Sequence, residues 1–175
     1  MTILNSKHRT GEPLNLPISL ESAKLYLKIS HKLEDALIVG LIKSTTNTFE
    51  LYTGIALINQ EWQIGYRQFS TLNLSLPIKP IQEIINITLQ DVKGRFIKFN
   101  GHHYHLEANE LSFLVFPCSY IVKIHLKAGF GKNETTIPED IKAALLNHIA
   151  YLYENRGNYR DQNTKIFEQF KGVRV

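Results

Sequence analysis

The chain has 175 residues, of which 43% are hydrophobic and 21% are charged. This composition is typical of globular proteins and unlike that of disordered chains, so we expect one soluble domain spanning residues 1–175. The single cysteine, Cys118, excludes a disulfide framework. No apolar run approaches the ~20 residues of a membrane-spanning helix, so no membrane contact is expected. The formal net charge of +4 permits contact with nucleic acid without requiring it.

The N-terminal third of the chain predicts helices over about residues 19–54. Residues 1–15 are polar and lack the features of a secretory signal, so we expect the chain to stay in the compartment where it is made. Ser19 is a good N-cap for a short helix that ends near residue 30. From Leu33, apolar or small residues recur every three or four positions as far as Gly54, which can cap a second helix in the left-handed conformation.

The middle of the chain, about residues 56–128, changes to a period of two. Apolar residues alternate with polar ones in several short runs, and this alternation predicts an inserted antiparallel β-sheet. Turn residues separate the runs, and Asn100-Gly101 is the candidate two-residue hairpin turn.

The C-terminal part predicts another helix over about residues 137–156, beginning with a capping box formed by Thr136 and Glu139. Its apolar residues cover more than one face, so we expect a neighbouring subunit to bury part of it. The tail, about residues 157–175, carries apolar residues with little chain left to bury them. The predicted fold class is therefore α+β, with a helical core from the N- and C-terminal helices and an inserted antiparallel β-sheet.

The sequence offers no catalytic set. His102, His103 and His105 are the densest group of metal-capable side chains, and on a strand His103 and His105 would share a face. A histidine-rich exposed hairpin is the favoured interpretation, because no further ligands with metal-site spacing accompany them. Cys118 has no local partner for nucleophilic catalysis. We therefore predict no catalytic, cofactor-binding or metal site, and a protein that is not an enzyme.

Several stretches between residues 17 and 156 together form a recognisable series. In order they read Pro17–Leu27 (PISLESAKLYL), Glu34–Ile38 (EDALI), Glu50–Leu57 (ELYTGIAL) with Gln60 and Trp62, Leu76–Pro80 (LPIKP), Lys127–Gly131 (KAGFG), Ile137–Ala144 (IPEDIKAA) and Leu152–Arg156 (LYENR). In this order and spacing the chain resembles the head–tail connector (adaptor) proteins of tailed bacteriophages, prophages and gene transfer agents. Members of that group are also labelled possible DNA-packaging proteins.

The resemblance implies a structural role without catalysis or cofactor. It implies a ring of about a dozen subunits beneath the portal protein, joining the DNA-filled head to a head-completion or tail-terminator protein. The resemblance also implies that the protein is made in the host cytoplasm and resides at the head–tail junction of the virion, where it could contact passing DNA non-specifically. We hypothesise a ring interface at Leu146, Ala150 and Tyr153. We further hypothesise that the tail docks into the portal through Ile166, Phe167, Phe170 and Val173.

Two alternative functions stay open at this point. A small DNA-binding component of the packaging machinery would bind duplex with a steep dependence on salt. A metal-dependent enzyme built on the histidine hairpin would hold a metal ion that is lost when His103 is replaced.

Overall fold

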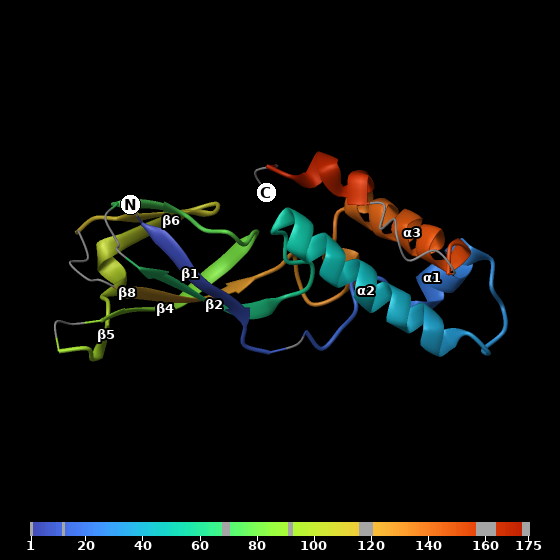
Figure 1. Cartoon of the computed structure of the whole chain (residues 1–175), viewed down its shortest axis with the longest axis horizontal. Coiled ribbons are helices and arrows are strands. Elements are labelled where there is room, and N and C mark those ends of the chain that lie inside the picture. Colours follow the sequence, from blue (N-terminus) through green and yellow to red (C-terminus); the bar gives the residue numbers. More distant parts are fainter. Residues whose placement is uncertain are drawn as a thin grey trace. The chain divides into compact units, whose positions relative to one another are not determined.

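The structure is a computed structural model that describes residues 2–11, 13–67, 71–90, 93–115, 121–156 and 164–172. It confirms the α+β class, with helices and antiparallel sheets along one chain (Figure 1). Residues 13–58 and 130–173 form one compact unit, here called the helical unit, while residues 1–12, 59–129 and 174–175 form the β unit. The expectation of a single domain over residues 1–175 stays a prediction, because cooperativity of unfolding decides it.

The helical unit contains α1 (Leu20–Leu27), α2 (Asp35–Thr53), α3 (Glu139–Glu154) and the short 3-10 helices η2 (Glu134–Thr136) and η3 (Thr164–Phe170). Ser19 caps α1 as predicted, since its hydroxyl accepts a bond of 3.0 Å from the Ser22 N–H. Gly54 ends α2 with φ 72°, a conformation that costs glycine little. Within the described ranges, no helix combines the length and apolar character required to cross a membrane.

The predicted capping box of α3 is wrong, although the helix itself lies where expected. Thr136 ends η2, and its hydroxyl donates to the Asn133 carbonyl at 2.7 Å instead of capping α3. Pro138 occupies the N-cap position and makes no side-chain capping bond, whereas the Ile141 N–H in the first turn donates to Asp140 Oδ1 at 2.9 Å. Glu139 and Asp140 still lie in that turn, where the helix dipole favours negative charge.

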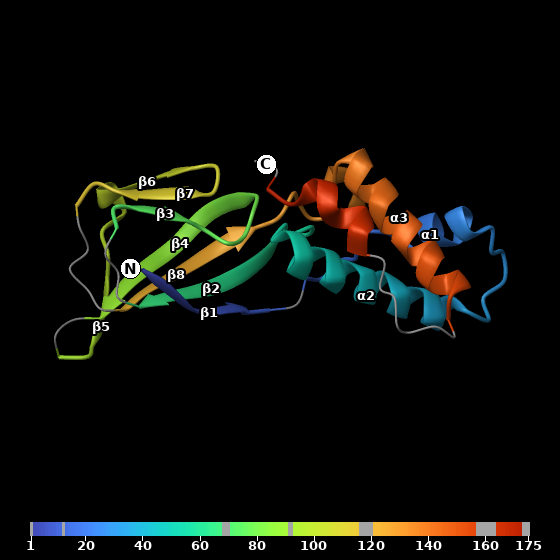
Figure 2. The ribbon, with the colours of Figure 1, turned by 45° about the horizontal axis from the view of Figure 1, so that its top comes forward.

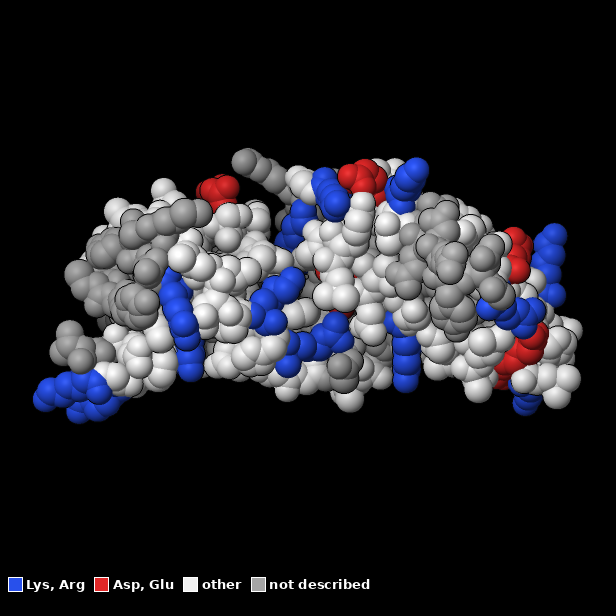
Figure 3. Space-filling view, viewed as in Figure 1, with Lys and Arg blue, Asp and Glu red and all other residues white. Residues whose placement is uncertain are grey.

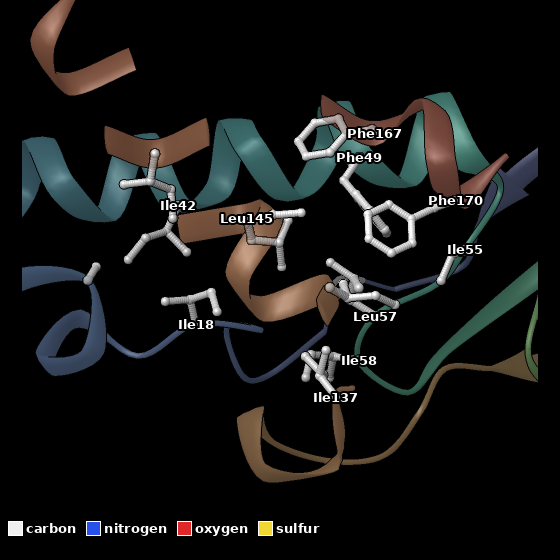
Figure 4. Packing of buried hydrophobic residues seen from close by; sticks show 14 of the residues in the cluster. Ile18, Ile42, Phe49, Ile55, Leu57, Ile58, Ile137, Leu145, Phe167 and Phe170 are labelled. Carbon is white, nitrogen blue, oxygen red and sulfur yellow. The ribbon is translucent and has the colours of Figure 1, made fainter. Parts of the chain in front are cut away.

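The core of the helical unit brings together residues from α1, α2, α3 and η3 (Figure 4). Phe49 of α2 contacts the two phenylalanines of η3, with ring centroids 5.1 Å from Phe167 and 5.6 Å from Phe170, both edge-on. Phe167 is 0% exposed and Phe170 is 5% exposed. The expectation that little of the chain is left to bury the apolar residues of the tail is therefore wrong, because α2 and α3 pack against its phenylalanines.

The β unit contains two antiparallel sheets. The five-stranded sheet has the order β1 (Ile3–Arg9), β2 (Gln60–Arg67), β8 (Ile121–Ala128), β4 (Ile81–Gln90) and β5 (Phe96–Lys98). The three-stranded sheet has the order β3 (Asn73–Ser75), β7 (Glu110–Phe113) and β6 (Tyr104–Glu107). The sheet region matches the prediction, except that the polar N-terminal residues add β1 to its edge.

The three-stranded sheet covers one face of the five-stranded sheet (Figure 2). Along β8 the side chains of Val122, Ile124 and Leu126 are buried, whereas the residues between them are partly exposed. This alternation assigns the two faces of the sheet, because successive side chains of a strand point to opposite sides. The five-stranded sheet therefore has a covered apolar face and an opposite polar face.

The predicted hairpin turn at Asn100-Gly101 is wrong. Asn100 caps a 3-10 helix, η1 (Gly101–His103), by accepting a bond of 3.1 Å from the His102 N–H. An asparagine side chain can accept a bond from the backbone two residues on, so the same residue can cap a helix or take part in a turn. The hairpin instead joins β6 to β7 through Ala108, which has φ 51°.

Candidate interaction surfaces

Helix α3 has a buried side and a partly exposed side. Ile141, Leu145 and Ile149 are buried in the helical core. Leu146, Ala150 and Tyr153, the residues predicted for a ring interface, are each partly exposed. They recur at steps of four and three residues, so they share one side of the helix. Leu146 also packs against the helical core. The role of the three residues in a ring stays a prediction.

Tyr153 is held in place by a small polar cluster at the end of α3. Its hydroxyl donates to Glu34 Oε2 at 2.6 Å, and Arg156 Nη1 donates to Glu34 Oε1 at 2.7 Å. The Arg156 guanidinium lies 4.2 Å from the centre of the Tyr153 ring. The bonds from Tyr153 and Arg156 lower the pKa of Glu34, and the bond to Glu34 raises the pKa of Tyr153. Sequence analysis missed Glu34, which lies more than one hundred positions from its partners.

The predicted portal-docking residues fall into three groups. Phe167 and Phe170 are buried in the helical core, and Ile166 is partly buried against it. Val173 lies outside the described residues. The Tyr52 hydroxyl donates to the Glu168 carboxylate, and Lys171 Nζ lies 3.8 Å from the centre of the Tyr52 ring. The aromatic part of the tail is thus occupied by contacts within its own chain.

His148 is a buried polar residue beneath η3. It is 1% exposed, its Nδ1 lies 3.0 Å from Thr45 Oγ1, and its ring centre lies 4.8 Å from that of Phe167. In the part of the chain that the structure describes, its Nε2 has no hydrogen-bond partner. Burial lowers the pKa of His148, because a charged imidazole would lose its hydration there.

The histidines singled out by the sequence do not share one strand. His102 and His103 lie in η1 and are exposed, while His105 lies in β6. The expectation that His103 and His105 share a strand face is therefore wrong. Over the described ranges no three His, Cys, Asp or Glu side chains are arranged to hold a metal ion. Cys118 lies outside those ranges.

The formal charge of the chain is unevenly distributed between the two units. By sequence the β unit carries ten Lys and Arg against six Asp and Glu, whereas the helical unit carries ten of each kind. The whole formal net charge of +4 therefore belongs to the β unit. Figure 3 shows mainly blue residues over the β unit at the left, and interspersed red and blue residues over the helical unit.

Neither the comparison with protein-family models nor that with curated proteins gave a match. Solved structures do match over almost the whole chain. A chain in the "Neck of empty GTA particle computed with C6 symmetry" has a TM-score of 0.81 at 19% identity, and the match covers 98% of this chain and 97% of that one. A chain in the "Virion of native gene transfer agent (GTA) particle" has a TM-score of 0.79 at 19% identity, with the same coverage.

A third matching chain belongs to the "Neck of native GTA particle computed with C12 symmetry", with a TM-score of 0.78 and 20% identity over 98% of this chain and 97% of that chain. The chain therefore has the fold of proteins found in the neck of gene transfer agent particles. The resemblance to head–tail connector proteins read from the sequence is confirmed at the level of the fold.

Proposed function

We propose that the protein is a structural head–tail connector (adaptor) of a tailed phage or phage-like particle. The observation that carries this proposal is the match of nearly the whole chain, in both directions, to chains of gene transfer agent necks. In this role the protein forms a ring under the portal protein and links the DNA-filled head to a head-completion or tail-terminator protein. It is made in the host cytoplasm and acts at the head–tail junction, and the role requires positioning of partners without catalysis.

A ring needs two different complementary surfaces on each subunit, because its contacts are heterologous. The stripe of Leu146, Ala150 and Tyr153 on α3 is one such surface in this proposal. It is partly exposed and contains apolar groups, and the bonds to Glu34 fix the orientation of Tyr153. The matching necks were computed with C6 and C12 symmetry, which is consistent with assembly around a closed axis.

The ring is tested by mixing the purified protein with its cognate portal and measuring mass by light scattering and shape by negative-stain microscopy. We expect a ring of about a dozen subunits on the portal. Ala150→Arg should prevent it, because a long charged side chain enters the interface. Ser44→Arg is the matched control, since Ser44 is an exposed residue on α2. A protein that ignores the portal, or equal behaviour of both variants, would contradict the proposal.

The tail is the proposed portal-docking element, through Ile166, Phe167, Phe170 and Val173. Because Phe167 and Phe170 are buried in the helical core, docking requires them to leave that core. Deleting the residues after Asn163 would therefore damage the fold as well as the contact. A test must keep the tail and control its position.

Such a test uses the contact between Tyr52 and Glu168. In a Cys118→Ser background, Tyr52→Cys and Glu168→Cys are joined by a cleavable bis-maleimide, which fixes η3 on the helical unit. We expect portal binding to be lost while the linker is intact and to return when it is cleaved. The same pair left unlinked is the control. Undiminished binding by the linked protein would show that the tail need not leave its core.

A further inference from the structure

We propose that the polar face of the five-stranded sheet binds the phosphate backbone of duplex DNA without reading its sequence. This face, here called the open face, lies opposite the side covered by the three-stranded sheet (Figure 2). The place where it would meet DNA, inside an assembled neck, rests on the proposed function. The binding itself is a property of this chain and can be measured without a ring.

The strand register defines the open face. Residues directly opposite one another in antiparallel strands lie on the same side of a sheet. One row across the sheet therefore contains Ser6, Gly65, Lys123, Thr88 and Lys98. The position of Ser6 agrees with this assignment, since its Oγ lies 2.5 Å from where a Cβ on Gly65 would be.

Cations from three strands extend over this face. Lys98 comes from β5, Lys123 and Lys127 come from β8, and Arg67 comes from β2 opposite Ile121. Lys98 and Arg67 are exposed, and Lys123 Nζ lies 4.0 Å from the centre of the Phe96 ring, a contact that leaves its N–H donors available.

Among the residues that the structure describes, the acidic ones on the open face are confined to one end of it. Glu61 and Glu83 both lie opposite Lys127. Glu61 is further engaged by His125, whose Nε2 lies 2.9 Å from Glu61 Oε2. The rest of the face, around Lys123 and Lys98, is therefore the part with the strongest attraction for anions.

The residues between the cations favour nucleic acid over a protein partner. Gln63, Asn86 and Thr88 place amide and hydroxyl groups at the centre of the face. Such groups, together with Lys and Arg, are the usual donors to phosphate oxygens. Apolar residues of the face, Phe96 on the edge strand β5 and Ile121 at the start of β8, lie at its margin. A protein–protein interface has the opposite arrangement, with an apolar or aromatic centre and a polar rim.

The spacing of the cations also suits a duplex. Lys123 and Lys127 are four residues apart on one strand, which corresponds to about 13 Å. Lys98 and Lys123 lie two strands apart, which corresponds to about 10 Å. Both separations are close to the ~12 Å width of the DNA major groove, so neighbouring lysines can reach phosphates on its two sides. Contacts of this kind carry no base preference, which allows the duplex to slide.

The experiment measures binding of fluorescently labelled duplexes of arbitrary sequence by anisotropy, from about 50 to 200 mM salt. We expect binding that weakens steeply as salt increases. Replacing Lys98, Lys123 and Lys127 by Gln should lower the affinity at low salt at least about tenfold and reduce the salt slope by about 2 to 3. The matched control replaces Lys32, Lys43 and Lys165, exposed residues of the helical unit, by Gln.

The control variant loses the same formal charge, so equal weakening in both variants would show a net-charge effect and overturn the assignment of the face. Absence of duplex binding by the unmodified protein at the lowest salt would also overturn it. So would tighter binding of polyglutamate than of duplex, which would indicate an acidic protein partner. Circular dichroism checks that each variant is folded. Ring formation on the portal without duplex binding would overturn this inference alone, whereas duplex binding without a ring would overturn only the proposed function.

Discussion

Replacing Phe167 by alanine tests whether η3 belongs to the helical core in solution. Phe167 is 0% exposed, and its ring contacts those of Phe49 and His148 at centroid distances of 5.1 and 4.8 Å. Truncating a fully buried phenylalanine costs about 3–5 kcal/mol, because apolar burial is lost and a cavity remains. The edge-on contact with Phe49 accounts for about 0.5–1.5 kcal/mol of this cost. For a chain of this length the melting temperature should fall by about 6–20 °C.

The assay is unfolding in urea, followed by circular dichroism for the helices and by fluorescence of Trp62, the only tryptophan, for the β unit. Leu51→Ala is the matched control, because Leu51 lies on α2 but is 75% exposed, and it should change stability by less than about 0.5 kcal/mol. A loss below about 1 kcal/mol for Phe167→Ala would refute the packing of η3. If both probes shift together, the chain unfolds as the single domain that the sequence predicts. If only the helical signal shifts, the two units unfold separately.

Three further results follow from the burial or close packing of single residues. Burial lowers the pKa of His148 below that of an unfolded histidine, so the unfolded chain binds more protons and stability should decline as the pH falls through about 6.5. Thermal unfolding between pH 7.5 and 5.5 should show this decline, and His148→Gln should make the decline smaller. Gly131→Ala should cost about 1–3 kcal/mol in urea unfolding, since its new Cβ would lie 2.6 Å from the Cβ of Thr136. Gly65→Ala should change the same measurement by less than about 1 kcal/mol, because its close neighbour is the rotatable Ser6 hydroxyl; a larger loss there than at Gly131 would contradict both estimates.

The helices could be predicted because their signals are local. Ser19 and Gly54 mark helix ends by side-chain and backbone conformations that act within a few residues, and both have the predicted role. The same rules failed at Thr136, where a hydrogen bond to Asn133 competes with capping of α3. The prediction of a hairpin turn at Asn100 was wrong for a related reason, since the Asn100 side chain caps η1 instead. Local rules thus predicted where helices begin and end, but they did not predict which of two competing side-chain hydrogen bonds forms.

The sheet arrangement depended on contacts that sequence patterns do not record. Residues Ile3–Arg9 form β1 although most of them are polar, because β1 is an edge strand and pairs with β2 far along the chain. The alternation in β8 identified a strand with one buried face. It did not reveal that the other face gathers cations from β2 and β5, since that grouping arises only from the strand order. The open face could therefore not be found before the fold was known.

In the proposed docking mode, the residues of the tail affect both the stability of the free protein and its binding to the portal. Its apolar residues were visible in the sequence, but their site in the core depends on Phe49, far away in α2. In the proposed docking mode, the same phenylalanines serve the core of the free protein and the portal contact of the assembled one. Each 1.4 kcal/mol gained by packing in the free protein then weakens portal binding about tenfold. The free energy of the portal contacts must exceed the free energy gained by packing η3 in the free protein. A substitution that loosens η3 but keeps the phenylalanines, such as Tyr52→Phe, should therefore strengthen portal binding and lower the stability of the free protein.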